Sequence, residues 1–226
     1  MIDSRFFRQE CYIDGRWLKA GREAIKVNNP ATSEIIGSVP KFGREETRAA
    51  IDAAHQAFPA WRARPAAERA EYCRKIYEAL MANQEELGGL LTIEMGKSLT
   101  EAKGEVAYAA NFFRWFGEEA RRVYGDIIPS PWTDKRIVVT KEPVGVVGSI
   151  TPWNFPTAMI ARKAAAALAA GCTFVGKPAS QTPFSAIAYG VIADEIGLPK
   201  GVLNIITGSA SAITDEMCEN PKLRKI

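Results

Sequence analysis

Apolar positions recur at two different spacings along this chain. Between residues 43 and 124 they recur every three or four positions, which is the period of amphipathic α-helices. From residue 144 onward, short continuous apolar runs alternate with Ala-rich segments, and such runs are typical of strands buried on both faces of a sheet. This alternation predicts an α/β fold with a doubly wound parallel sheet, and we expect the earlier helices to form a layer on it.

Short β-prone segments precede the helices. Asp14-Gly15 lies between β-prone residues and indicates a hairpin. Residues 25–39 predict two more short strands around the turn-rich segment 28–32. We expect these N-terminal hairpins to wrap the surface of the larger domain.

Four helices are predicted between residues 43 and 124. Pro59 lies in the segment 58–61 and is expected to interrupt the first helix. Asn83 and Glu86 have the spacing of a capping box, and Thr100 is expected to cap the last helix. An aromatic stripe at residues 112–116 is expected to pack in the core rather than against a cofactor. The predicted spans are 43–55, 65–82, 83–96 and 100–123.

The segment from Glu142 to Pro183 predicts one strand–helix–strand unit. Two prolines in the loop 151–156 prevent either strand or helix from continuing through it. Ligands of open α/β sheets bind at the carboxyl ends of the strands, where residues 151–154 and 177–180 both fall. A further helix, strand and helix are expected at 182–196, 203–207 and 211–219.

Two motifs in this segment resemble the aldehyde dehydrogenase superfamily. They are PWNFP at Pro152–Pro156 and GKPASQTP at Gly176–Pro183, separated by about twenty residues. The surrounding ITPWNFPTAMIARK is most similar to the succinate-semialdehyde dehydrogenase branch, and the resemblance extends along most of the chain. It implies a Rossmann-like NAD(P)-binding domain, although no regular G-x-G-x-x-G follows a strand here.

The resemblance also implies a division of the chain. Residues 1–124 would be the N-terminal strands and helices of the cofactor-binding domain, and 143–226 its βαβ core, truncated before the catalytic domain. Residues 125–142 would be the projecting β segment of the oligomerisation region, which implies a homo-oligomer, a dimer or a tetramer; the alternative is a plain surface hairpin. A strand is expected to begin near Leu223, so we expect the chain to be cut in the middle of a fold.

Two residues are implied to act on the substrate. Asn154 of PWNFP would stabilise the negative charge that develops on the aldehyde oxygen, because a fixed amide N–H can donate to it. The alternative is a loop Asn that satisfies nearby backbone groups. Arg162 would bind a distal carboxylate of the aldehyde, for which a guanidinium is a natural partner; the alternative is an ordinary exposed Arg.

The implied cofactor is NADP or NAD. Lys177 at the end of a strand can reach ribose hydroxyls or phosphates, with a solvated surface Lys as the alternative. Many relatives carry Glu where this chain has Ser180, and a carboxylate there would repel a 2′-phosphate, so we expect NADP to be accepted. Thr214 stands where the family usually has a second glycine after Gly208. The remaining cofactor-binding candidates are Ile150, Thr151, Pro152 and Trp153.

The family nucleophile is expected beyond this chain. The family attacks the aldehyde with a cysteine and forms a thiohemiacetal, but neither the cysteine motif nor the glutamate-base motif occurs in these residues. If the short chain is natural, the alternative is a non-catalytic nucleotide-binding or structural protein of the same fold. An α/β hydrolase lacks support because there is no G-x-S-x-G.

Composition excludes some classes of binding partner. The 226 residues carry a net charge of +3 with basic and acidic residues mixed throughout, which argues against a nucleic-acid surface. No apolar run reaches membrane-spanning length, and the charged N-terminus does not resemble an export signal. The four cysteines show no disulfide framework or metal spacing, so we expect a reduced, cytoplasmic protein without a metal.

Overall fold

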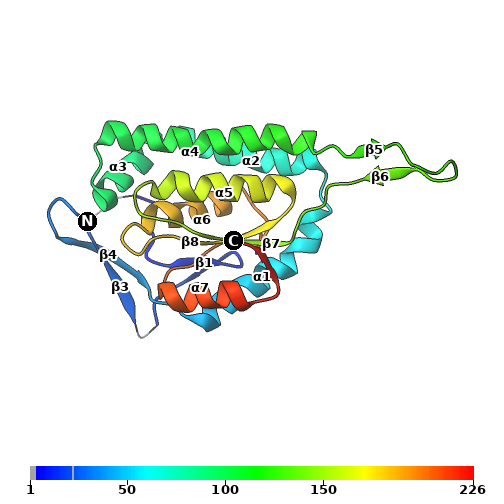
Figure 1. Cartoon of the computed structure of the whole chain (residues 1–226). Helices are drawn as coiled ribbons and strands as arrows, with labels where there is room; N and C mark the ends of the chain where they lie inside the picture. Colours follow the sequence, from blue (N-terminus) through cyan, green and yellow to red (C-terminus); the bar gives the residue numbers. More distant parts are fainter. Residues whose placement is uncertain (1–3, 22) are drawn as a thin grey trace.

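A mixed sheet lies at the centre of the computed structural model, which describes residues 4–21 and 23–226 (Figure 1). Its six strands have the order β10-β7-β8-β9-β1-β2. The first four are parallel to one another, whereas β1 and β2 are antiparallel to their neighbours. The predicted α/β fold with a parallel sheet is therefore confirmed. The strand bounds are β1 Cys11–Ile13, β2 Arg16–Leu18, β7 Val146–Ile150, β8 Thr173–Lys177, β9 Leu203–Ile205 and β10 Leu223–Lys225.

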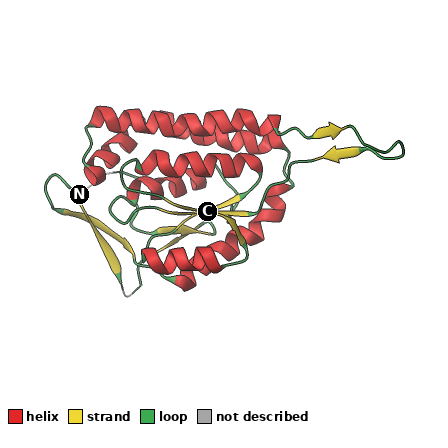
Figure 2. Cartoon of the chain, viewed as in Figure 1, coloured by secondary structure: helices red, strands yellow, loops and turns green. Residues whose placement is uncertain are grey.

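Helices cover both faces of the sheet, as a doubly wound arrangement requires. Helices α5 (Pro156–Ala170) and α6 (Phe184–Glu195) pack on one face, and α1 (Arg44–Arg62) and α7 (Ala210–Glu219) on the other (Figures 1 and 2). Three more helices form an outer layer over α5 and α6. They are α2 (Ala66–Ala82), α3 (Gln84–Met95) and α4 (Leu99–Glu119), and a 3-10 turn at Ala120–Arg122 follows α4.

The β7–α5–β8 unit follows the sequence pattern closely. All five residues of β8 are buried, as expected for a strand covered on both faces. The Ala-rich α5 ends at Gly171, which adopts the left-handed conformation that favours glycine (φ 91°). Ile150 pairs with Lys177 across the two strands, and the Thr151 N–H donates to the Lys177 carbonyl (3.0 Å). The two motif-bearing loops therefore leave the sheet side by side.

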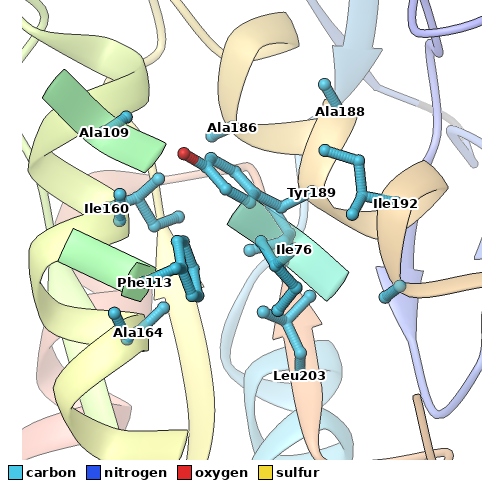
Figure 3. Close-up of a cluster of buried hydrophobic side chains, with 14 of the residues drawn as sticks. Ile76, Ala109, Phe113, Ile160, Ala164, Ala186, Ala188, Tyr189, Ile192 and Leu203 are labelled. Carbon is cyan, nitrogen blue, oxygen red and sulfur yellow. The ribbon is translucent and has the colours of Figure 1, made fainter. Parts of the chain in front are cut away.

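The outer helices share a core with α5, α6 and the sheet (Figure 3). Phe113 of α4 packs against Tyr189 of α6, with 5.9 Å between ring centroids. The Tyr189 hydroxyl donates to the carbonyl of Thr157 at the start of α5 (3.1 Å). The expectation of a core aromatic stripe is right for Phe113 and wrong for Trp115, which is 61% exposed.

The N-terminal hairpins do not both wrap the surface, contrary to the expectation. Strand β1 is completely buried and pairs with β9 through Tyr12 and Ile205, so the β1–β2 hairpin extends the central sheet. A buried strand beside another strand satisfies backbone groups that would otherwise be unpaired. Of the two N-terminal hairpins, the one formed by β3 (Ala24–Asn28) and β4 (Ile35–Pro40) is separate from the central sheet.

Helix α1 continues through Pro59, so the predicted interruption is wrong. Pro59 is exposed, where water can solvate the carbonyl that loses its helical hydrogen bond. Trp61 is buried in the last turn, and its indole N–H donates to the Leu168 carbonyl (3.2 Å). We infer that burial of the Trp61 ring holds the last turn of α1 in helical geometry.

Two predicted side-chain caps are also wrong, although Asn83 does occupy the N-cap position of α3. Helix α4 begins after Ser98, whose hydroxyl accepts from the Glu101 N–H (3.3 Å) while the Glu101 carboxylate accepts from the Ser98 N–H (3.3 Å). Thr100 lies inside that helix. The Asn83 side chain does not cap α3, because its amide N–H donates to the Ala79 carbonyl instead (2.7 Å).

Strands β5 (Asp126–Ile128) and β6 (Ile137–Val139) form a hairpin that projects from the body of the molecule (Figures 1 and 2). Its apolar side chains face solvent: Ile127 is 81% exposed and Val138 is 65% exposed. No helix in the described part of the chain is long and apolar enough to cross a membrane.

Candidate active site

The backbone of Asn154 is fixed by a lysine from the outer helical layer. Lys97, in the loop before α4, donates from Nζ to the Asn154 carbonyl (3.2 Å). The same ammonium lies 4.2 Å from the centroid of the Phe155 ring, a cation–π distance. The Asn154 Oδ1 is buried and has no hydrogen-bond partner among the described residues. The main chain here is therefore held in place while the side-chain oxygen is not tied to the fold.

A buried glutamate holds the helix that follows this loop. Glu105 of α4 accepts from the backbone N–H groups of Thr157 (2.9 Å) and Ala158 (3.1 Å) through Oε1. Its Oε2 lies 2.5 Å from the Lys97 Nζ. A carboxylate at a helix N-terminus satisfies free N–H groups and complements the positive end of the helix dipole. Lys97 and Glu105 thus connect α4 to the start of α5.

A second buried glutamate accepts hydrogen bonds from the free N–H groups at the start of α6. Glu94 of α3 accepts from the N–H groups of Phe184 (2.8 Å) and Ser185 (2.7 Å). Burial raises the pKa of Glu94 to about 7, against the lowering effect of these hydrogen bonds. The loop after β8, which contains Ser180, is therefore anchored at the start of α6.

Lys177 is buried at the carboxyl end of β8. Its Nζ donates to the Pro178 carbonyl (3.1 Å), and burial lowers its pKa. The hydroxyls of Thr151 and Thr182 are buried without hydrogen-bond partners among the described residues. Buried polar groups of this kind are usually satisfied by a ligand or by water. A buried ammonium and unpaired hydroxyls suit the hydroxyl groups and phosphates of a dinucleotide.

The structure brings the other cofactor candidates together only in part. Trp153 and Ser180 line one cavity of about 650 Å³, next to Glu94 and strand β3. Pro152 is exposed. Gly208 approaches the backbone of Phe42, with which it forms an isolated β-bridge, and a Cβ there would collide with that backbone. Packing against Phe42 therefore gives Gly208 a structural role independent of any ligand.

Arg162 shares a small cavity with the loop of Asn154. It is exposed on α5, and its guanidinium lies 5.4 Å from the centroid of the Phe112 ring. Phe155 and Met159 line the same cavity of about 190 Å³. A cation on one side of an apolar cavity can hold the charged end of a short aliphatic molecule.

The cysteines lie in places that do not favour nucleophilic chemistry. Burial raises the pKa of Cys11 to about 11 and that of Cys73 to about 12, which disfavours the reactive thiolate. Cys172 is buried, and Cys218 is exposed on α7, across the sheet from α5. His55 is exposed on α1. No group of three or more metal-binding side chains occurs within residues 4–21 and 23–226.

Sequence reasoning did not predict three residues that contribute to the site: Lys97, Glu94 and Glu105. Each glutamate occupies a position in a buried helical stripe: Glu94 follows Leu87, Leu90 and Leu91, and Glu105 lies among Ala102, Val106 and Ala109. A charged residue in an apolar stripe needs a partner when it is buried. A glutamate within an apolar helical stripe was therefore the sequence pattern that could have indicated the role of Glu94 and Glu105. Lys97 has no comparable signal, because its partners lie eight or more positions away.

Comparison with known proteins identifies the family. The profile of the aldehyde dehydrogenase family matches residues 17–226. The chain belongs to this family. In this aldehyde dehydrogenase chain, the PWNFP and GKPASQTP loops follow the carboxyl ends of two neighbouring strands, as the strand–helix–strand pattern predicted.

Two curated relatives are named as semialdehyde dehydrogenases. The chain is 58% identical to a glutarate-semialdehyde dehydrogenase of Pseudomonas aeruginosa and 56% identical to the NADP(+) succinate-semialdehyde dehydrogenase of Escherichia coli. Each match covers 99% of this chain and 47% of the relative. The chain thus spans about half the length of these relatives.

A solved structure agrees in detail. The succinate-semialdehyde dehydrogenase of Burkholderia pseudomallei superposes with a TM-score of 0.97 at 51% identity, covering all of this aldehyde dehydrogenase chain and 47% of the other.

Proposed function

We propose that the protein containing this chain oxidises an aldehyde with a distal carboxylate, succinate semialdehyde or glutarate semialdehyde, with NADP+ or NAD+ as hydride acceptor. The observation that carries the proposal is that Arg162 and Phe155 line one small cavity, and Phe155 adjoins Asn154. A substrate with its carboxylate at Arg162 would have its aldehyde end toward the Asn154 loop. The names of the relatives support this substrate class.

In the proposed reaction, Asn154 donates from its side-chain amide to the aldehyde oxygen as negative charge develops there. Lys177, Ile150 and Thr151 lie together at the ends of β7 and β8 and would hold the dinucleotide, with Pro152, Trp153, Ser180 and Gly208 as the remaining candidates. The bound nicotinamide supplies the hydride acceptor. The attacking cysteine, which forms the thiohemiacetal, is proposed to lie outside these 226 residues, since three of the four cysteines here are buried and Cys218 lies on α7, across the sheet from α5.

The choice between the two cofactors follows from Ser180 in this proposal. A neutral hydroxyl beside the ribose does not repel a 2′-phosphate as a glutamate would, so NADP+ is accepted. That the relative in Escherichia coli is named for NADP(+) supports this choice.

Two further proposals concern organisation. The projecting β5–β6 hairpin, with Ile127 and Val138 facing solvent, supports a role in a homo-oligomer, a dimer or a tetramer. The division into 1–124, 125–142 and 143–226 stays a proposal, as does the cytoplasmic location. The projecting segment β5–β6 supports the middle boundary.

The test is Arg162→Ala in the intact protein. Loss of a charged hydrogen bond of about 1.5–3 kcal/mol should raise the KM for succinate semialdehyde by about 10–100-fold. Butanal, which has the same chain length without the carboxylate, should be oxidised with an unchanged KM. Arg114→Ala, an exposed arginine on α4 that pairs with Glu118, serves as the matched control. Equal losses on both aldehydes would refute the substrate assignment.

The alternative is a non-catalytic nucleotide-binding or structural protein of the same fold. This alternative applies only if the short chain is natural, because the described cysteines then include no favourably placed thiol. Binding of NADP+ by the intact protein without turnover of any aldehyde would favour this alternative.

A further inference from the structure

We propose that Lys97 and Glu105 are positioning residues that set the place of the Asn154 amide. This inference rests on the proposed function, because it assigns them a role in the reaction attributed to Asn154. Neither side chain lines the cavity beside Arg162. Both act through the loop and the first turn of α5.

The pair holds the segment 154–158 from the side of α4. The side chain of Lys97 is 11% exposed and that of Glu105 is 1% exposed, so both charges are almost removed from water. Lys97 binds the Asn154 carbonyl, and Glu105 binds the N–H groups of Thr157 and Ala158. From α6, the Tyr189 hydroxyl binds the Thr157 carbonyl. The turn containing Asn154 is therefore tied to two other helices.

The charges make this arrangement specific. Buried ion pairs stabilise a fold little on balance, and removing one partner leaves the other charge unpaired. A stable helix start requires only a cap, which a serine can provide, as Ser98 does for α4. The additional ammonium contributes a bond to the Asn154 carbonyl and a contact with the Phe155 ring. The pair therefore orders the reactive loop as well as the helix.

Loss of the pair should affect the chemical step more than substrate binding. A donor to a developing oxyanion acts mainly in the transition state, and a displacement of about 1 Å can lower a rate by about 100-fold. Lys97→Met and Glu105→Gln should each lower kcat by about 10–100-fold, with the KM for the semialdehyde within about threefold. Because the two residues form one unit, the double variant should lose no more than about threefold beyond the worse single variant.

The experiment uses the intact protein and two matched variants. Glu101→Gln alters a glutamate one turn from Glu105 that caps only its own helix, so kcat should stay within about twofold. Lys97→Arg keeps the positive charge and should recover part of the lost kcat; it also carries the test if Lys97→Met does not fold. Unchanged kcat in Lys97→Met and Glu105→Gln, or multiplicative losses in the double variant, would overturn the inference.

Hydrogen exchange separates this inference from the proposed function. The backbone amides of Asn154, Phe155, Thr157 and Ala158 should exchange faster by at least about tenfold in Lys97→Met and Glu105→Gln, but not in Glu101→Gln. This readout requires no turnover. If the wild-type protein oxidises no aldehyde, the proposed function fails while exchange still tests the anchoring. If exchange at 154–158 matches the wild type, the positioning role is wrong even in an active enzyme.

Discussion

Replacing Glu94 by Gln should change how the stability of the protein depends on pH. Glu94 of α3 is buried against the start of α6. Burial raises the pKa of its carboxyl to about 7 from an ordinary value of about 4.5. The Gln side chain has nearly the same shape and keeps one of the two acceptor oxygens that bind the N–H groups of Phe184 and Ser185, and the cost of the lost acceptor is the same at every pH. It has no proton to lose, so the comparison isolates the titration of this carboxyl.

The sign follows from proton linkage. Between about pH 4.5 and about pH 7 the native carboxyl keeps a proton that the unfolded chain has lost, so the wild-type free energy of unfolding falls as pH rises. Below this window both states are protonated, and above it the cost of the buried charge is complete. A pKa difference of this size corresponds to about 3 kcal/mol.

The assay is urea unfolding followed by circular dichroism, at several pH values from about 4.5 to about 8. The free energy of unfolding of Glu94→Gln minus that of the wild type should increase by about 3 kcal/mol across this range. Other carboxyls titrate in both proteins and cancel.

Hydrogen bonding to Glu94 opposes the effect of burial on its pKa, and this opposing effect determines which result would contradict the prediction. The two N–H groups and the positive end of α6 favour the ionised carboxylate, whereas burial disfavours it. If the hydrogen bonds dominated, the pKa would lie below 4.5, and the difference would decrease with rising pH. A constant or decreasing difference would therefore refute the reasoning for Glu94.

Substitutions at three other positions test the core and the cofactor loop. Phe113→Ala should lower the free energy of unfolding by about 3–5 kcal/mol because it leaves a cavity between α4 and α6, whereas Phe113→Leu should cost less; urea unfolding measures both. Tyr189→Phe should cost about 1 kcal/mol, since the Thr157 carbonyl loses the Tyr189 hydroxyl and keeps only its helical donor, and the absence of any measurable loss would contradict this. Ser180→Glu should shift the ratio of kcat/KM values toward NAD+ over NADP+ by at least about tenfold, while Ser180→Gln should not; an unchanged ratio would exclude the role of Ser180.

The sequence predicted well what depends on short-range pattern. The strands at 144–150 and 172–176, the Ala-rich helix between them and the stop at Gly171 all appear within a few residues of their expected places. Apolar runs, helix propensity and a glycine stop signal are local properties of the chain. The adjacency of the two motif loops followed from the same unit.

Features set by distant partners were not predictable in this way. Trp61 keeps α1 helical past Pro59 through contacts with Leu168, more than a hundred positions away. Strand β1 is placed by β9, near the other end of the chain. Tertiary contacts of this kind override local propensity, and nothing near residue 59 or residue 12 signals them.

In the candidate site, too, local sequence patterns predicted some features, whereas features that depend on distant residues were missed. The motif at 152–156 makes Asn154 a candidate, but the groups that hold its loop come from other elements. Glu105 signals its importance only as a charge within an apolar stripe, and its N–H partners lie about fifty positions later. For the start of α4, however, the signal was local: Ser98 and Glu101 have the spacing of a capping box, and Thr100 was the wrong choice.

The most direct test of the central claim is nicotinamide reduction by the intact protein with succinate or glutarate semialdehyde, compared between the wild type and Asn154→Ala. The account predicts that the wild type reduces NADP+ or NAD+. Asn154→Ala should lose about 100–1,000-fold in kcat while binding the cofactor as tightly as the wild type in a fluorescence titration. Turnover at the wild-type kcat in Asn154→Ala, or cofactor binding without any aldehyde oxidation by the wild type, would contradict the account.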